Sequence, residues 1–166
     1  MTDILLISGG NDSMYIYNVF VHMDFELVYF DYGQRYVKQE IKRLPRGTKI
    51  IKIPKLKVKD NGYVCGRNLM FLIELAKRYD EANIYMGSNS EDIFEDNNKA
   101  YLTKAIDVIN TSFDTKLKVI TPLARFSKKK IMNYINKSNI DTYSCYKGGK
   151  IPCGKCKACL SVINAT

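Results

Sequence analysis

Short apolar segments alternate with amphipathic helical segments along most of this chain. The apolar segments are residues 4–7, 26–30, 49–53, 83–86 and 117–120. Stretches with apolar residues at helical spacing follow them, at 14–23, 35–44, 68–79, 98–112 and 127–137. Strands that alternate with crossover helices pair in parallel, and such a sheet is covered by helices on both faces. The pattern therefore predicts an α/β fold with a five-stranded parallel sheet.

The length suits one domain with a small appendage. The chain has 166 residues, of which 46% are hydrophobic and 26% charged, an ordinary globular composition. Helical and strand periodicity disappears from Tyr143 onward, and the tail looks too irregular to pack by apolar burial alone. We expect an α/β domain over residues 1–142 and a separate C-terminal segment over 143–166 that packs on it.

The charge balance favours anionic partners. Lys and Arg number 26 and Asp and Glu 17, a net charge of +9, which suits nucleotides, nucleic acid or an acidic small molecule. The lysine runs at 52–59 and 128–130 are either solvated faces or a nucleic-acid patch. No apolar run approaches the ~20 residues that span a bilayer, and the N-terminus lacks signal-peptide features. We expect a cytoplasmic protein without a membrane partner.

A glycine-containing loop connects the first predicted strand to the first predicted helix. It reads Ser8, Gly9, Gly10, Asn11, Asp12 and Ser13. Ligands of open α/β sheets bind at the carboxyl ends of the strands, and a helix N-terminus there attracts an anion. Ser8 and Ser13 can add hydroxyl donors, and Asp12 can hold Mg²⁺. The alternative is a plain turn with Asp12 or Ser13 as the helix cap.

Four of the five cysteines lie in the last 22 residues of the chain. They are Cys145, Cys153, Cys156 and Cys159. In a reducing compartment this clustering indicates metal binding rather than disulfides. Four thiolates suit tetrahedral Zn²⁺ and leave no open coordination position, so we expect a structural zinc site that orders the tail.

The glycine loop resembles the pyrophosphate loop of the PP-loop ATPases, which cleave ATP between the α and β phosphates. Together with the zinc tail and the segments between, it resembles the 7-cyano-7-deazaguanine synthases of the queuosine and archaeosine pathway. The resemblance is carried by Asp31-Tyr32-Gly33-Gln34-Arg35, Tyr63-Val64-Cys65-Gly66-Arg67-Asn68, Gly87-Ser88-Asn89 with Glu91-Asp92, Pro122-Leu123 with Ser127-Lys128, and Ser144-Cys145-Tyr146 with the later cysteines.

The resemblance implies conversion of 7-carboxy-7-deazaguanine and ammonia to the nitrile, with ATP as substrate and Mg²⁺ beside it. The carboxylate is adenylated, ammonia displaces AMP, and a second adenylation permits dehydration. The expected catalytic residues are Asp12, Arg35, Arg67 and Lys128. The expected substrate residues are Tyr32, Gln34, Asn68, Asn89, Asp92 and Asp96, and Ser8–Ser13 hold the phosphates. A nucleic acid is not required, and a homodimer is left open.

The chain departs from the family pattern after the fourth predicted strand. The family has a Tyr-Pro-Asp-Cys segment there, whereas residues 92–98 contain neither Pro nor Cys and only Asp96 aligns. Tyr36 replaces a His and Cys65 a Pro. These differences leave open whether the product is the nitrile or the amide. They also leave two alternatives: another PP-loop enzyme that modifies tRNA, and a catalytically silent nucleotide-binding or nucleic-acid-binding homologue.

Overall fold

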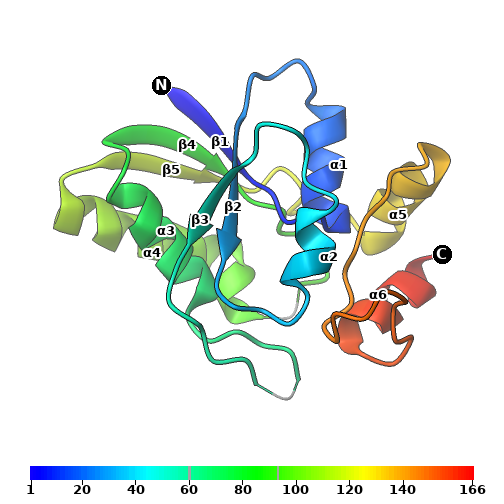
Figure 1. The fold of residues 1–166 in the computed structure, drawn as a ribbon. Helices are drawn as coiled ribbons and strands as arrows, with labels where there is room; N and C mark the ends of the chain where they lie inside the picture. Colours follow the sequence, from blue (N-terminus) through cyan, green and yellow to red (C-terminus); the bar gives the residue numbers. More distant parts are fainter. Residues whose placement is uncertain (60, 93) are drawn as a thin grey trace.

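The computed structural model describes residues 1–59, 61–92 and 94–166. Its centre is one sheet of five strands, all of them parallel to their neighbours. The strands are β1 (Thr2–Leu6), β2 (Glu26–Asp31), β3 (Lys49–Lys52), β4 (Glu81–Tyr85) and β5 (Lys116–Ile120), in the order β3-β2-β1-β4-β5 (Figure 1). The predicted α/β fold with a five-stranded parallel sheet is confirmed.

Helices lie on both faces of this sheet (Figure 1). They are α1 (Asn11–Val19), α2 (Val37–Ile41), α3 (Arg67–Ala76), α4 (Lys99–Phe113), α5 (Lys128–Lys137) and α6 (Lys157–Ala165), with a 3₁₀ turn, η1 (Glu95–Asn97). Within the described residues, every helix is too short or too polar to cross a bilayer.

The central strand, β1, contributes side chains to two separate hydrophobic cores, because successive strand residues point to opposite faces of the sheet. Ile4 packs with Leu72 of α3 and Leu102 of α4. Leu5, its neighbour, packs with Ile16 of α1 and Ile131 of α5. Both strand residues are fully buried. The unbroken apolar run in β1 is therefore explained by burial on both sides.

The strand order reverses at β1. From β1 the chain builds β2 and β3 on one side, then crosses to β4 and β5 on the other. The loops that follow β1 and β4 consequently diverge to opposite faces and leave a crevice between them. Ligands of open α/β sheets bind at such a point, outside the carboxyl ends of the strands.

Two helices near the N-terminus differ from the predicted bounds. Helix α1 begins at Asn11, so the glycine loop already contains its first turn. Helix α2 covers only 37–41. Before the helix, the side chain of Gln34 turns back and accepts a hydrogen bond from Tyr32 N. After the helix, Pro45 disfavours helical backbone at the residue that precedes it.

The expectation of an irregular tail was wrong for nine of its last ten residues, which form α6. Cys159, Val162 and Ala165 share one side at three-residue spacing. Cys159 and Ala165 are buried, and Val162 and Ala165 join the core that α1 and α5 form. The helical period is hard to recognise in the sequence because Cys159 is both an expected metal ligand and an apolar helix position.

Candidate functional site

A cavity of about 530 Å³ opens at the carboxyl edge of the sheet. It lies where the strand order reverses, and segments from the N-terminal third, the middle and the C-terminal end of the chain line it. Thirteen of the residues expected to form the site line this cavity: Ser8, Gly10, Asn11, Asp12, Ser13, Tyr32, Gln34, Arg67, Asn68, Asn89, Asp92, Asp96 and Lys128. Gly9 and Arg35 are expected residues that do not line it.

The glycine loop is held in shape by its own hydroxyl groups. Ser8 N–H donates to Ser13 Oγ at 3.1 Å, and Gly10 N–H donates to Ser8 Oγ at 3.3 Å. Gly9 has a φ of +69°, and a Cβ there would lie 3.0 Å from the carbonyl oxygen of Glu40. Glycine is thus required at position 9 for packing, although its backbone does not line the cavity.

Lys128 and Asp12 form an ion pair inside the cavity. Lys128 Nζ lies 2.8 Å and 3.0 Å from the two carboxylate oxygens of Asp12. The lysine begins α5 and the aspartate lies in the first turn of α1, so the pair joins the N-terminal ends of two helices. Lys128 is only 8% exposed. The site therefore brings an ammonium, a carboxylate and a helix N-terminus to one place, the groups that bind a metal–polyphosphate.

Gln34 belongs to a buried network that sequence reasoning missed. Its amide Nε2 lies 2.6 Å from Tyr29 Oη and 2.9 Å from Glu40 Oε2, and Tyr29 Oη donates to the same carboxylate oxygen at 2.7 Å. Burial raises the pKa of Glu40 to about 7, although these hydrogen bonds oppose the shift. Gln34 thus supports the cavity wall with an amide already committed to protein partners.

A second group of polar residues surrounds the start of α3. Arg67 Nε donates to Asn68 Oδ1 at 3.2 Å, and Asn68 Nδ2 donates to the main-chain oxygen of Asp96 at 2.9 Å. The hydroxyls of Tyr32 and Tyr36 lie 2.8 Å apart nearby. Arg67 is permanently charged and has no carboxylate ion pair among the described residues. It can therefore neutralise an anionic ligand.

The loop after β4 carries further carboxylates of the site. Asn89 N–H donates to Asp92 Oδ2 at 2.9 Å, and Asn89 Nδ2 reaches Asp12 Oδ2 at 3.4 Å. Burial raises the pKa of Asp92 to about 6, although the Asn89 N–H lowers it. Burial likewise raises the pKa of Asp96, with Arg67 opposing. Asp92 can therefore exchange a proton near neutral pH.

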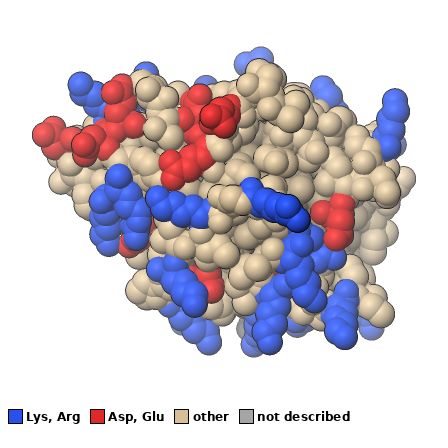
Figure 2. All heavy atoms as spheres, turned by 45° about the horizontal axis from the view of Figure 1, so that its top comes forward, with Lys and Arg blue, Asp and Glu red and all other residues tan. Residues whose placement is uncertain are grey.

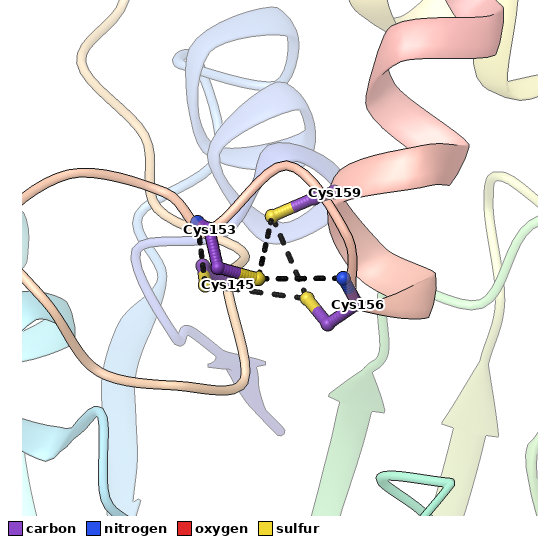
Figure 3. A group of neighbouring side chains, drawn as sticks. All are labelled: Cys145, Cys153, Cys156 and Cys159. Atoms are coloured by element: carbon purple, nitrogen blue, oxygen red, sulfur yellow. Dashed lines mark hydrogen bonds between the residues drawn. The ribbon is translucent and has the colours of Figure 1, made fainter.

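Four cysteines form a second centre beside the cavity (Figure 3). The sulfurs of Cys145, Cys153, Cys156 and Cys159 all lie within 4.8 Å of one another. Individual Sγ–Sγ distances are 4.0 Å for 153–159, 4.0 Å for 145–156 and 3.5 Å for 156–159. Four sulfurs at about 2.3 Å from one tetrahedral Zn²⁺ would be about 3.8 Å apart. The arrangement fits a metal ion of this type, as the cysteine spacing predicted.

The segment that contains the four cysteines, which we call the cysteine segment (residues 143–166), contacts the glycine loop directly, together with the adjoining Thr142. Tyr143 N–H donates to the Gly9 carbonyl at 2.9 Å. Asn11 Nδ2 donates to Ser144 Oγ at 3.0 Å, and Asn11 Oδ1 accepts from Thr142 Oγ1 at 2.6 Å. Both the nitrogen and the oxygen of the Asn11 amide are therefore bonded to the segment just before Cys145. Three hydrogen bonds therefore join the glycine loop to the residues that precede the first cysteine.

Arg35, an expected catalytic residue, does not line the main cavity. Its side chain is exposed and lines a second, adjoining cavity bordered by residues 55–59, 61 and 62 and by the cysteine segment. Gln34 and Tyr36, on either side of it, are buried. Sequence reasoning missed further polar residues that line the main cavity: Tyr29, Tyr36, Glu40, Glu91, Ser144 and Ser161. The apparent polarity of Glu40 on a short helix concealed its burial.

Comparison with known proteins agrees with the geometry. The parallel sheet, the glycine loop at the strand reversal and the helices on both faces define an α/β protein of the PP-loop type. A solved structure described as a predicted subunit of tRNA methyltransferase from Methanocaldococcus jannaschii has a similar fold. Its TM-score is 0.51 at 16% sequence identity, and the match covers 82% of this chain and 75% of that one.

Sequence comparison identifies the family. The family model of the queuosine biosynthesis protein QueC matches residues 48–165. A 7-cyano-7-deazaguanine synthase from Leptospira interrogans is 31% identical, over 95% of this chain and 83% of its own length. One from Sulfurisphaera tokodaii, named 7-cyano-7-deazaguanine synthase 1, is 27% identical over 96% of this chain and 90% of its own. The chain belongs to the QueC family of queuosine biosynthesis proteins, as the resemblance implied.

Proposed function

We propose that this chain is a cytoplasmic, ATP-dependent synthase that converts 7-carboxy-7-deazaguanine and ammonia to 7-cyano-7-deazaguanine, with AMP and pyrophosphate as the other products. The observation that carries the proposal is the Lys128–Asp12 pair at the glycine loop, inside a cavity large enough for a nucleotide and a purine-sized acid. The matched relatives are named 7-cyano-7-deazaguanine synthases, which supports the choice of product.

In the proposed first step, a carboxylate oxygen of the substrate attacks the α-phosphorus of ATP. A P–O bond forms, the bond to the β-phosphate oxygen breaks, and pyrophosphate leaves. In this proposal the backbone N–H groups of Gly10 and Asn11, with the Ser8 and Ser13 hydroxyls, would hold the outer phosphates, and the Gly10 N–H would exchange its 3.3 Å hydrogen bond to Ser8 Oγ for one to a phosphate oxygen. Asp12 would hold the Mg²⁺ that accompanies ATP, which releases Lys128 to stabilise charge on the α-phosphate.

In the second step, ammonia adds to the acyl-adenylate carbon, AMP leaves and the amide forms. A second ATP then adenylates the amide oxygen, and loss of AMP with the N–H protons yields the nitrile. Arg67 would hold the acidic substrate before activation, and Asn68 and Asp96 would orient it from the same wall. Asp92 would accept a proton from the attacking ammonia, since its raised pKa suits transfer near neutral pH. Tyr32, Gln34 and Asn89 would shape the pocket.

We further propose that the four cysteines hold Zn²⁺ in a structural role. A closed tetrathiolate site has no position for substrate, so it would supply order and not chemistry. The division into an α/β domain over 1–142 and a zinc segment over 143–166 remains part of this proposal.

The decisive experiment is mass spectrometry of the products from ATP, ammonium and 7-carboxy-7-deazaguanine. We expect the nitrile, with two AMP formed for each molecule converted. Accumulation of the amide would place the end of the reaction one step earlier. Release of ADP and phosphate, or no turnover, would overturn the proposal. Asp12→Asn, which keeps the size of the side chain, is expected to abolish turnover and thereby link the activity to this cavity.

A further inference from the structure

A second cavity, of about 610 Å³, adjoins the first and is strongly basic. We call it the basic groove. Seven cationic side chains line it: Arg35, Lys55, Lys57, Lys59, Lys147, Lys155 and Lys157. All seven are exposed, and no Asp or Glu occurs among the described residues of its wall. Figure 2 shows one face of the molecule, on which Lys and Arg gather along the lower part and Asp and Glu mainly at the upper left.

The positive charge of the groove is not neutralised within the described part of the protein. The ion pairs found there involve other cations. Lys59 and Lys157 instead lie over the rings of Tyr63 and Phe94, at 5.5 Å in each case. A metal bound by four thiolates would contribute a charge of about −2. Among the described residues that line the groove this leaves an excess of about five positive charges, which favours an anionic ligand.

The cations are arranged along two walls. Lys55, Lys57 and Lys59 follow one another at two-residue intervals on the loop before α3, so neighbouring Cα atoms in the series are at most about 7 Å apart. Lys147, Lys155 and Lys157 come from the cysteine segment. This arrangement provides successive contacts for an extended chain of negative charges and not one contact for a single ion.

The groove shares a wall with the main cavity. Gln34, Tyr36, Gly62, Tyr146 and Lys157 line both cavities. The ring of Tyr146 lies against Gly62 at this shared wall, so closely that a Cβ at Gly62 would be 2.5 Å from two of its carbons. A ligand in the groove would therefore lie beside the candidate active site.

We propose that the basic groove binds the sugar-phosphate backbone of a single-stranded nucleic acid. A concave, cationic groove beside an aromatic ring is the arrangement that single strands use, with phosphates in the groove and a base against the ring. A folded acidic protein would need a contact surface of the order of 800 Å² per partner, which is far larger than the wall of this one groove. The inference goes beyond the proposed synthase activity, whose substrates are small molecules, and does not depend on it.

The test is fluorescence anisotropy of a labelled oligothymidylate of about 12 nucleotides, with the full-length metal-loaded protein at several KCl concentrations. Each phosphate contact to a single strand adds about 0.7 to the slope of log affinity against log salt. Replacing Lys55, Lys57 and Lys59 together by Gln is expected to reduce that slope by about 2 and to weaken binding by about tenfold or more at low salt. Replacing Lys147 and Lys155 by Gln is expected to reduce the slope of log affinity against log salt by about 1.4.

The matched control removes three lysines from another surface, by Lys104→Gln, Lys116→Gln and Lys118→Gln. These side chains are exposed and line neither cavity. The control has the same net charge as the first triple variant, and we expect it to bind like the wild type. The proposal fails if the wild type does not bind at low salt, or if both triple variants lose affinity equally. It also fails if polyglutamate or tripolyphosphate displaces the strand equally well at equal charge, or if a duplex binds more tightly.

Discussion

Asn11 and Ser144 lie 133 residues apart in the chain, yet Asn11 Nδ2 donates a hydrogen bond of 3.0 Å to Ser144 Oγ. Asn11 belongs to the glycine loop, and Ser144 immediately precedes the first cysteine of the metal centre. The bond joins the two features that define this protein. The shape of the loop therefore depends on the order of the cysteine segment, although no cysteine lies in the loop itself.

Metal removal should consequently weaken nucleotide binding before the sheet unfolds. Without a metal the four thiols no longer hold residues 142–146 in place, and the contacts to Gly9 and Asn11 are lost. We expect about a tenfold or greater loss of affinity for a non-hydrolysable ATP analogue, measured calorimetrically. Far-ultraviolet circular dichroism monitors the sheet. Cys153→Ser should behave like the chelated protein and Cys65→Ser like the wild type. Undiminished affinity in the metal-free protein would contradict the coupling.

Lys128→Met should impair turnover far more than it impairs folding. The substitution keeps the approximate length of the side chain and removes the ammonium that lies 2.8 Å from Asp12. Loss of one charged contact to a transition state costs about 10²–10³ in kcat. The adjacent Lys129 is exposed, so Lys129→Met is the matched control and should retain wild-type rates. Equal rates for both variants would exclude Lys128 from the chemistry.

Glu40 should make stability depend on pH. Burial raises its pKa from 4.5 to about 7 in the folded protein; Asp31 adds to the shift, while Gln34, Tyr29 and Arg67 oppose it. The folded state therefore binds more protons than the unfolded state between these values, so stability decreases as pH rises from about 4.5 to 7. The contribution has an upper limit of about 3 kcal/mol.

Glu40→Gln should remove that contribution and flatten the profile of unfolding free energy against pH. Urea denaturation of both proteins at several pH values measures the difference, and the effects of other titrating groups cancel in the comparison. Superimposable profiles would show that Glu40 does not carry the raised pKa.

Gly62→Ala should destabilise the wall between the two cavities. The added Cβ would lie 2.5 Å from the ring of Tyr146, at a φ of +85°. Gly47→Ala is the matched control, because Gly47 has a φ of +83° but a Cβ added there would have no neighbour within 4 Å. We expect about 1–3 kcal/mol more destabilisation at position 62 than at 47. Tyr146→Ala in the same chain should restore part of the loss, and thermal unfolding of all these variants checks this.

Much of the architecture follows from local sequence patterns. Strands such as β1 and β2 are continuous apolar runs, because both faces of a parallel sheet are buried, and such runs are conspicuous. The carboxyl ends of parallel strands share one edge, which is why the loop with Asp12 could be expected at a site, whereas Asn89 and Lys128 were expected there from the family resemblance. The four cysteines were recognisable because their spacing suits a single ion.

The burial of Glu40 and the orientation of Arg35 depend on tertiary contacts that no local sequence pattern shows. Glu40 looks like a surface residue of a short helix, and only the packing of α2 against β2 reveals it beside Tyr29 and Gln34. Arg35 follows Gln34 directly, so the same motif could place either side chain inward; the backbone turn at Gly33 buries the amide and exposes the guanidinium. Burial of a polar side chain is decided by its surroundings and not by its neighbours in sequence.

The contact between the first loop and the cysteine segment has a consequence for synthesis of the chain on the ribosome. All five strands have been translated once Ile120 has been added to the chain. The residues that form hydrogen bonds to Gly9 and Asn11 are translated later; they are Thr142, Tyr143 and Ser144. Cys159 follows after them. A nascent polypeptide can therefore assemble its whole sheet while the loop at the end of β1 is still unfastened. Because Cys159 is the last of the four cysteines to be translated, the set of thiols that could hold a metal ion is complete only after the residues that contact the loop have been made.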